Sequence, residues 1–105
     1  MSLQYGLNNR TISSVCAVFS SHANIHKAIL YGSRAKGNFH TGSDIDLTFF
    51  GDNISPQLLG TIYDELDDLL LPYTFDLSVY ADLKNTELRE HIDKVGKLFY
   101  QRDAQ

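Results

Sequence analysis

The sequence predicts an α/β (α+β) fold, with a small mixed β-sheet and helices packed mainly on one of its faces. Short apolar or alternating runs, which are typical of strands, are separated by longer stretches with apolar residues at helical spacing. The chain has 105 residues, which favours a single domain over 1–105 that can bury a real core. Its 43% hydrophobic and 21% charged residues are normal for a soluble globular protein.

Three helices are predicted from apolar residues that recur every three or four positions. The first covers residues 11–22, and its stripe is formed by Ile12, Val15, Cys16 and Phe19. The second covers 56–70, where Ser55 is the expected N-cap, Pro56 is the first helical residue and Pro72 stops the helix. The last covers about 85–95 and ends at Gly96.

The strands are shorter. Residues 27–31 form an apolar run that ends at Gly32, whereas 44–50 and 74–80 alternate between polar and apolar residues. A last strand is expected near 98–100. Residues 33–42 are small, polar and rich in glycine, so we expect a turn, one or two helical turns and a loop. The predicted order is therefore α-β-α-β-α-β-α with a final β.

Charge and composition narrow the classes of partner. The nine Lys and Arg are scattered and outnumbered by thirteen Asp and Glu, for a net charge of -4, which disfavours binding to a nucleic-acid template. No apolar run is long enough to span a bilayer and no signal peptide is evident, so a cytoplasmic location is the default expectation. Cys16 alone cannot form an intrachain disulfide, and its place in a helical pattern predicts a small buried side chain.

Three aspartates lie on the polar faces of two predicted strands. Asp44 and Asp46 are two positions apart, so both side chains leave the same face, and Asp76 lies on the polar face of 74–80. If the two strands are neighbours, three carboxylates converge, and their repulsion is relieved by a cation. Oxygen ligands suit Mg²⁺. Asp-x-Asp alone is usually a solvated strand face, and the joint arrangement is what favours a metal site.

The segment Gly32-Ser33-Arg34 follows the first predicted strand directly and precedes a short helix. A glycine lets the backbone approach a phosphate, and N–H groups at a helix start point toward an anion. The Ser33 hydroxyl can donate to a phosphate oxygen, and Arg34 can add charge. We therefore predict that Gly32, Ser33 and Arg34 bind the phosphates of a nucleotide, although a Gly-Ser dipeptide alone has little meaning.

Together these residues resemble the signature of the minimal nucleotidyltransferases of the DNA polymerase β superfamily. The signature is Gly-Ser after an apolar residue, then about ten residues, an Asp-x-Asp between apolar residues, and a third acid on a later strand. Here it is Gly32-Ser33, Asp44-Ile45-Asp46 and Asp76. The resemblance covers residues 10 to 101 and implies a polymerase-β-like fold. It also implies that Asp44, Asp46 and Asp76 are catalytic and hold Mg²⁺, and that Gly32 and Ser33 hold the triphosphate.

The resemblance further implies transfer of a nucleoside monophosphate, AMP from ATP, to an acceptor hydroxyl. Larger relatives add a helical domain that helps to build the acceptor pocket, whereas this chain ends at Gln105. Such short members are often encoded beside a helical HEPN protein and form a toxin–antitoxin pair, in which the nucleotidyltransferase is the antitoxin. The resemblance therefore implies that the acceptor is the HEPN partner, to which AMP is added.

Two alternatives stay open. The first is a non-catalytic antitoxin module that covers its partner. The second is a small-molecule nucleotidyltransferase similar to the aminoglycoside enzymes. A homodimer is also expected, since a thin domain of this type leaves one sheet face poorly covered. The four histidines have no metal-ligand spacing and are read as surface residues, and the acidic cluster at 64–68 is read as the solvated side of its helix.

Overall fold

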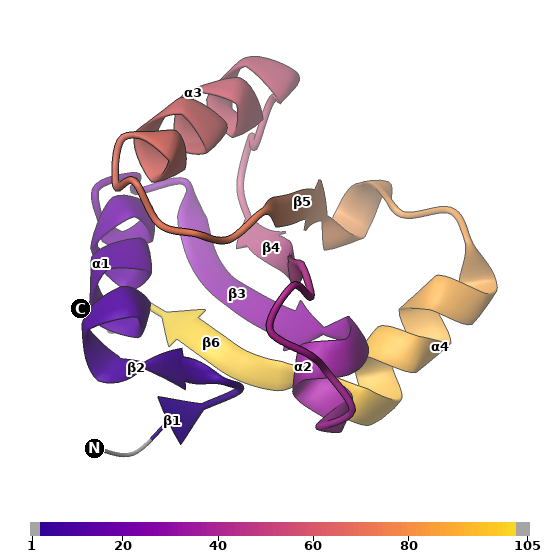
Figure 1. The fold of residues 1–105 in the computed structure, drawn as a ribbon. Coiled ribbons are helices and arrows are strands. Elements are labelled where there is room, and N and C mark those ends of the chain that lie inside the picture. Colours follow the sequence, from indigo (N-terminus) through magenta and orange to yellow (C-terminus); the bar gives the residue numbers. More distant parts are fainter. Residues whose placement is uncertain (1–2, 103–105) are drawn as a thin grey trace.

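A four-stranded mixed sheet forms the centre of the computed structural model, which describes residues 3–102 (Figure 1). Its order is β5-β4-β3-β6; β3 is antiparallel to β4 and β6, whereas β4 and β5 are parallel. The predicted mixed sheet is confirmed, and the expected last strand is part of it. The strands are β3 (Ile25–Tyr31), β4 (Ile45–Gly51), β5 (Phe75–Val79) and β6 (Lys97–Gln101).

Helices α1 (Asn9–Ser20) and α3 (Pro56–Asp67) cover one face of this sheet (Figure 1). The alternation predicted for β4 places Leu47 and Phe49 on this face, where both are fully buried. Phe19 of α1 meets the Phe49 ring edge-on, with ring centroids 5.0 Å apart. The core between helices and sheet is therefore built from the apolar stripes that the sequence pattern predicts.

Side-chain caps determine where the helices begin. Asn8 accepts the Thr11 N–H at 2.8 Å, so α1 starts two residues before the predicted boundary. Ser55 caps α3 as predicted. The prediction was wrong at the end of α3: the helix stops at Asp67, and Leu70 has a φ of 55° in the turn that leads to Pro72. No helix within residues 3–102 has the length and apolarity needed to cross a membrane.

Helix α4 (Thr86–Val95) packs on the opposite face of the sheet. It follows a 3₁₀ turn at Tyr80–Asp82 and reaches the sheet through buried Ile92. The chain after it is tight, because a Cβ on Gly96 would lie 2.6 Å from a methyl carbon of Ile29. Helices thus lie mainly, but not wholly, on one face, and α4 covers part of the face that carries the aspartates.

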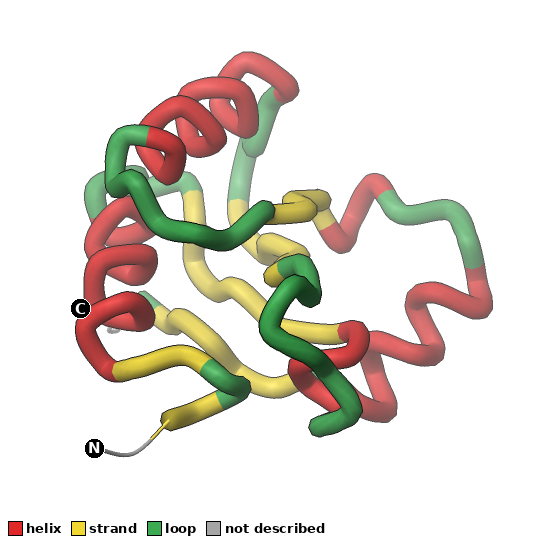
Figure 2. The backbone as a smooth tube through the Cα atoms, in the orientation of Figure 1, coloured by secondary structure: helices red, strands yellow, loops and turns green. Residues whose placement is uncertain are grey.

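A small N-terminal hairpin was not predicted. It pairs β1 (Leu3–Gln4) with β2 (Leu7–Asn8) through Tyr5 and Gly6, whose φ angles are 58° and 76°. Two consecutive positive φ angles match the tight hairpin turns that suit the twist of a strand pair. The hairpin brings Leu7 fully into the core. Figure 2 shows it beside the start of α1.

Gly60 offers a test of helix α3 that is independent of function. It lies inside the helix, is exposed, and a Cβ there would meet nothing within 4 Å. We expect Gly60→Ala to raise the free energy of unfolding by about 0.5–1 kcal/mol, because alanine loses less backbone entropy on folding. Urea denaturation measures this change, and a loss of stability would contradict the placement of Gly60 in an open helix position.

Candidate active site

The sheet topology gathers the predicted site residues at one end of the sheet. Asp46 and Asp76 are register partners in the parallel ladder of β4 and β5, and Tyr31 is the partner of Asp46 on β3. Because β3 is antiparallel to β4, the end of β3 lies beside the starts of β4 and β5. Gly32 follows Tyr31 directly, and Asp44 immediately precedes β4.

The three acids differ in exposure, and Asp46 is the perturbed one. Asp44 and Asp76 are exposed, whereas Asp46 is half-buried. Burial, together with the charges of Asp76 and then Asp44, raises the pKa of Asp46 to about 6. An acid held in this way gains from any cation that enters beside it.

The predicted metal ligands Asp44, Asp46 and Asp76 lie at the same end of the sheet without forming a closed cluster. Among residues 3–102, no group of three or more His, Cys, Asp or Glu side chains is gathered closely enough to hold a metal ion as it stands. The chemistry of the donors nevertheless fits Mg²⁺, which takes oxygen ligands and is held by one or two carboxylates together with phosphate oxygens. Asp46 and Asp76 lie side by side and repel, and Asp44 is exposed close to them. The site thus supplies carboxylates that a nucleotide-bound cation would draw together.

The backbone at Gly32 approaches Asp46 more closely than a side chain at this position would allow without a shift. Its φ is 75°, and a Cβ built on it would lie 2.3 Å from Oδ2 of Asp46. The turn after β3 therefore lies directly against the half-buried acid. This contact explains why glycine stands at the predicted phosphate-binding position.

The predicted short helix after Gly32 is confirmed as α2 (Gly32–Lys36). Its N-cap residue, Tyr31, makes no side-chain cap, so the first N–H groups of the helix have no local partner. The first of these groups has a partner that is distant in sequence: the Gly32 N–H donates to Nε2 of His91 at 3.1 Å. Sequence reasoning missed His91, since its spacing from the other histidines gave no signal and the contact depends on where α4 packs.

The side chain of Arg34, which was predicted to bind phosphates, instead binds two backbone carbonyls. Its side chain is buried; Nε and Nη2 donate to the Ser43 carbonyl at 3.2 and 3.0 Å, and Nη1 donates to that of Tyr5 at 2.8 Å. The guanidinium also lies 5.2 Å from the ring centroids of Phe39 and Tyr73. Arg34 therefore fastens α2 to the residue before Asp44 and to the N-terminal hairpin.

We expect Arg34→Lys to lower the free energy of unfolding by about 2–3 kcal/mol, because an ammonium cannot serve both carbonyls and leaves a buried acceptor unpaired. Lys36→Met, on the same helix but exposed, is the control and should change stability by less than about 0.5 kcal/mol. Urea denaturation gives both values. Wild-type stability in Arg34→Lys together with weaker ATP binding would restore the predicted phosphate role.

Hydroxyl groups continue the same face beyond the acids. Thr48 and Ser78 are register partners two positions after Asp46 and Asp76, and neither hydroxyl has a hydrogen-bond partner among the described residues. Burial raises the pKa of the Tyr31 phenol; the nearby Ser78 hydroxyl opposes that rise without reaching hydrogen-bond geometry, and the charges of Asp76 and Asp46 add to it. The floor of the site is thus polar but largely unpaired.

A column of two stacked rings, each with a cation against it, follows on this face. Nζ of Lys27 lies 4.5 Å from the Phe50 centroid, and the Phe50 ring stacks on Tyr80 at 4.6 Å. The Arg89 guanidinium lies 4.6 Å from the Tyr80 centroid, and Asp93 accepts a hydrogen bond from the Tyr80 hydroxyl. This column ties α4 to the sheet and bounds the polar face on the side away from the acids.

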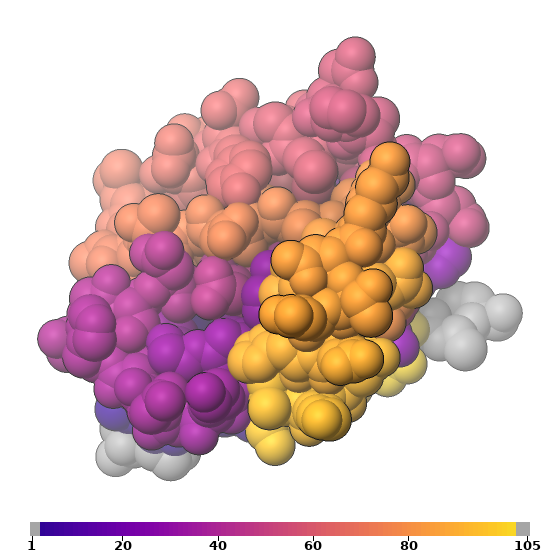
Figure 3. Space-filling model, turned by 90° about the vertical axis from the view of Figure 1, so that its right-hand side faces the viewer, coloured from indigo at the N-terminus to yellow at the C-terminus, as the bar shows by residue number. Residues whose placement is uncertain are grey.

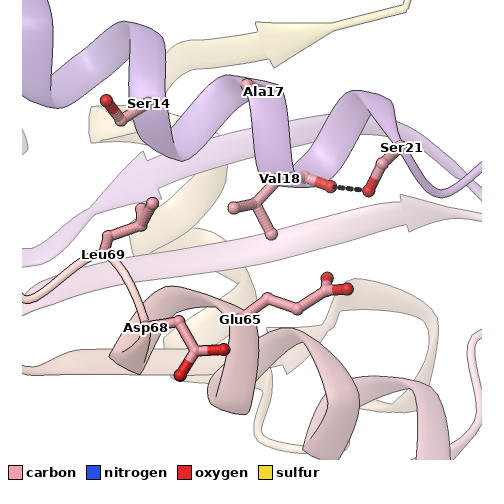
Figure 4. Close-up of a pocket in the computed structure, with 7 residues that line it drawn as sticks. All are labelled: Ser14, Ala17, Val18, Ser21, Glu65, Asp68 and Leu69. Atoms are coloured by element: carbon pink, nitrogen blue, oxygen red, sulfur yellow. Dashed lines mark hydrogen bonds between the residues drawn. The ribbon is translucent and has the colours of Figure 1, made fainter.

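A separate groove lies between α1 and α3 (Figure 4). It contains none of the three predicted acids and none of the Gly32–Arg34 segment. The groove has carboxylates on its α3 side and small or apolar residues on its α1 side. Its lining residues are Ser14, Ala17, Val18, Ser21, Glu65, Asp68 and Leu69. The groove is therefore not the candidate active site.

The comparison with protein families agrees with the geometry. Residues 14–105 match the model of the family described as polymerase beta, nucleotidyltransferase. The chain belongs to this family. It is therefore a nucleotidyltransferase, and the resemblance drawn from Gly32-Ser33 and the three acids is confirmed at the level of the family. None of the curated proteins compared with the chain matches it.

Solved structures share the fold of this nucleotidyltransferase. One is a toxin–antitoxin crystal structure with AMP-PNP, at a TM-score of 0.69 and 21% identity, covering 91% of this chain and 75% of that one. A mutant of the MntA-HpeT toxin–antitoxin has a TM-score of 0.67, 18% identity and the same two coverages. A protein assigned as a nucleotidyltransferase from Sulfolobus solfataricus has a TM-score of 0.54 and 23% identity, covering 87% of this chain and 77% of that one. At these identities the likeness establishes the fold.

Proposed function

We propose that this nucleotidyltransferase transfers AMP from ATP, with Mg²⁺, to a hydroxyl group on a HEPN toxin and thereby acts as an antitoxin. One observation carries the proposal. Asp46 lies against the Gly32 turn and is the register partner of Asp76, so a carboxylate pair for a cation is next to a turn for phosphates. In this family of enzymes, that combination suits a nucleoside triphosphate.

Each site residue would have a separate role in the transfer reaction. Asp44, Asp46 and Asp76 would hold Mg²⁺, which when bound supplies the positive charge that neutralises the triphosphate and the developing negative charge. Ser33 would donate its hydroxyl to a phosphate oxygen, and Gly32 would let the phosphates come close. Asp76, which is exposed, would take the proton of the acceptor hydroxyl. The acceptor oxygen then bonds to the α-phosphorus, the bond to the bridging oxygen breaks, and pyrophosphate leaves.

The identity of the nucleotide and of the partner rests on similarity. AMP-PNP, an ATP analogue, is named with one solved structure of this fold, and two of those structures are toxin–antitoxin complexes. The short chain is also similar to nucleotidyltransferases that are paired with HEPN proteins. Asp44 and Asp76 are exposed, which supports a site that a partner protein can reach from solvent. A homodimer of this chain stays a prediction.

One observation favours a second candidate, a module that neutralises its partner by binding alone. The acids among residues 3–102 are not gathered into a ready metal site. If they never bind a cation, they serve only as a charged surface. A small-molecule acceptor, as in the aminoglycoside enzymes, has no structural observation in its favour.

Calorimetry with ATP and GTP, with and without Mg²⁺, is the first test. We expect Mg²⁺-dependent binding of ATP that is lost in Asp44→Asn/Asp46→Asn and kept in Asp52→Asn, an exposed acid just after β4. Co-expression with the HEPN partner then tests the acceptor by the mass of the partner. A mass increase of one AMP that requires Asp46 supports the enzyme, whereas protection by Asp46→Asn without a mass change supports the binding module.

A further inference from the structure

His91 on α4 makes a contact with the nucleotide site that lies 59 residues away in sequence. Its Nε2 accepts the Gly32 N–H at 3.1 Å, and its ring stands edge-on to Tyr31 with centroids 6.2 Å apart. Because Nε2 receives a hydrogen bond, that nitrogen carries the lone pair and the other ring nitrogen carries the proton. Figure 3 shows the residues of α4 beside those of α2 on one face of the molecule.

The contact fixes the turn from a second direction. Gly32 is already constrained by its φ of 75° and by Asp46, which fills the space where a Cβ would be. Helix α2 has no side-chain cap from Tyr31, and His91 supplies a partner for its first N–H group. The amide of Gly32 is thus held by α4, whereas the following Ser33 stays half-exposed at the same turn.

We infer that His91 is a positioning residue for nucleotide binding: it anchors the Gly32 turn to α4, so that Ser33 and Asp46 stand in the geometry that receives the triphosphate. This inference rests on the proposed function. It assigns Gly32 a conformational role, with its amide held by the protein and its missing Cβ making room for Asp46. It also makes α4 part of the site, because moving α4 would release the turn.

His91→Phe and His91→Gln test the inference as a pair. Phenylalanine keeps a ring against Tyr31 but has no acceptor, whereas the side-chain oxygen of glutamine can accept the Gly32 N–H. We expect the Kd of ATP with Mg²⁺ to rise about fivefold in His91→Phe, the equivalent of one hydrogen bond, and to return toward wild type in His91→Gln. His26→Phe, an exposed histidine on β3, is the control.

Amide hydrogen exchange of Gly32 supplies a readout that does not depend on nucleotide. We expect faster exchange at Gly32 in His91→Phe and wild-type exchange in His91→Gln, with thermal denaturation confirming that both variants fold. Unchanged or tighter ATP binding in His91→Phe overturns the inference, as does unchanged exchange. If wild type binds no ATP with Mg²⁺, the proposed function fails instead, and the exchange result still reports whether His91 holds the turn.

Discussion

Asp46→Asn is expected to weaken Mg²⁺-dependent ATP binding by about 100-fold while raising the melting temperature of the metal-free protein at pH 8. The loss of binding follows because a neutral amide replaces the carboxylate beside Asp76, and a charge-assisted contact contributes roughly 3 kcal/mol. The gain in stability follows because the same substitution removes a carboxylate charge that is disfavoured by burial and by repulsion from Asp76 and Asp44. After allowance for solvent screening, the cost of this charge is on the order of 1 kcal/mol, or about 4–8 °C.

The gain in stability from Asp46→Asn should depend on pH. The pKa of Asp46 in the folded chain is about 6, above its ordinary 3.8, so ionisation opposes folding. The advantage of asparagine should be largest above pH 6, shrink as the pH falls from 6 toward 3.8, and vanish below 3.8. Thermal denaturation in EDTA at pH 8 and pH 4.5 measures the difference. Asp52→Asn is the control. An equal gain in melting temperature from Asp46→Asn at both pH values would contradict the explanation.

Gly32→Ala is expected to abolish nucleotide binding and to destabilise the fold more than a matched glycine substitution. Alanine at a φ of 75° costs about 1–2 kcal/mol in backbone strain, and its Cβ would also collide with Oδ2 of Asp46 at 2.3 Å. Either the turn or the acid must move, and both belong to the proposed site. Calorimetry with ATP and Mg²⁺, together with urea denaturation, measures the two effects.

Gly37→Ala separates the two causes. Gly37 has a φ of 87° at the end of α2, but a Cβ there would meet nothing within 4 Å. It should therefore lose only the strain term of about 1–2 kcal/mol and keep ATP binding. Equal losses of stability in the two variants, with ATP binding kept in Gly32→Ala, would show that the contact between Gly32 and Asp46 has no role in the site.

The candidate acids could be predicted because a local pattern reports them. Alternation along 44–50 and 74–80 put Asp46 and Asp76 on one type of face, and the parallel pairing of β4 and β5 then made them neighbours. The Gly32 turn was also predictable, since its glycine is required by the local φ and by the adjacent acid. These features depend on residues near one another in sequence or on the family signature.

Features that depend on distant carbonyls and amides could not be predicted. Arg34 was expected at the phosphates because it follows Gly32-Ser33, yet its partners are the carbonyls of Tyr5 and Ser43. The first of these belongs to a hairpin with two-residue strands, too short to leave an alternating pattern. His91 was read as a surface residue, because only the packing of α4 reveals its reach to Gly32.

Tyr63 has a consequence for the outer edge of the sheet. Its hydroxyl accepts the N–H of Leu77 at 2.8 Å, in the middle of edge strand β5. An unpaired edge is a template on which another chain can add a strand, and losing a central donor interrupts that template. The edge nearest Asp76 is therefore protected against strand addition and against aggregation by that route. Under the proposed function, a protein that presents a hydroxyl to Asp76 would approach over the open face, with its backbone left outside the sheet.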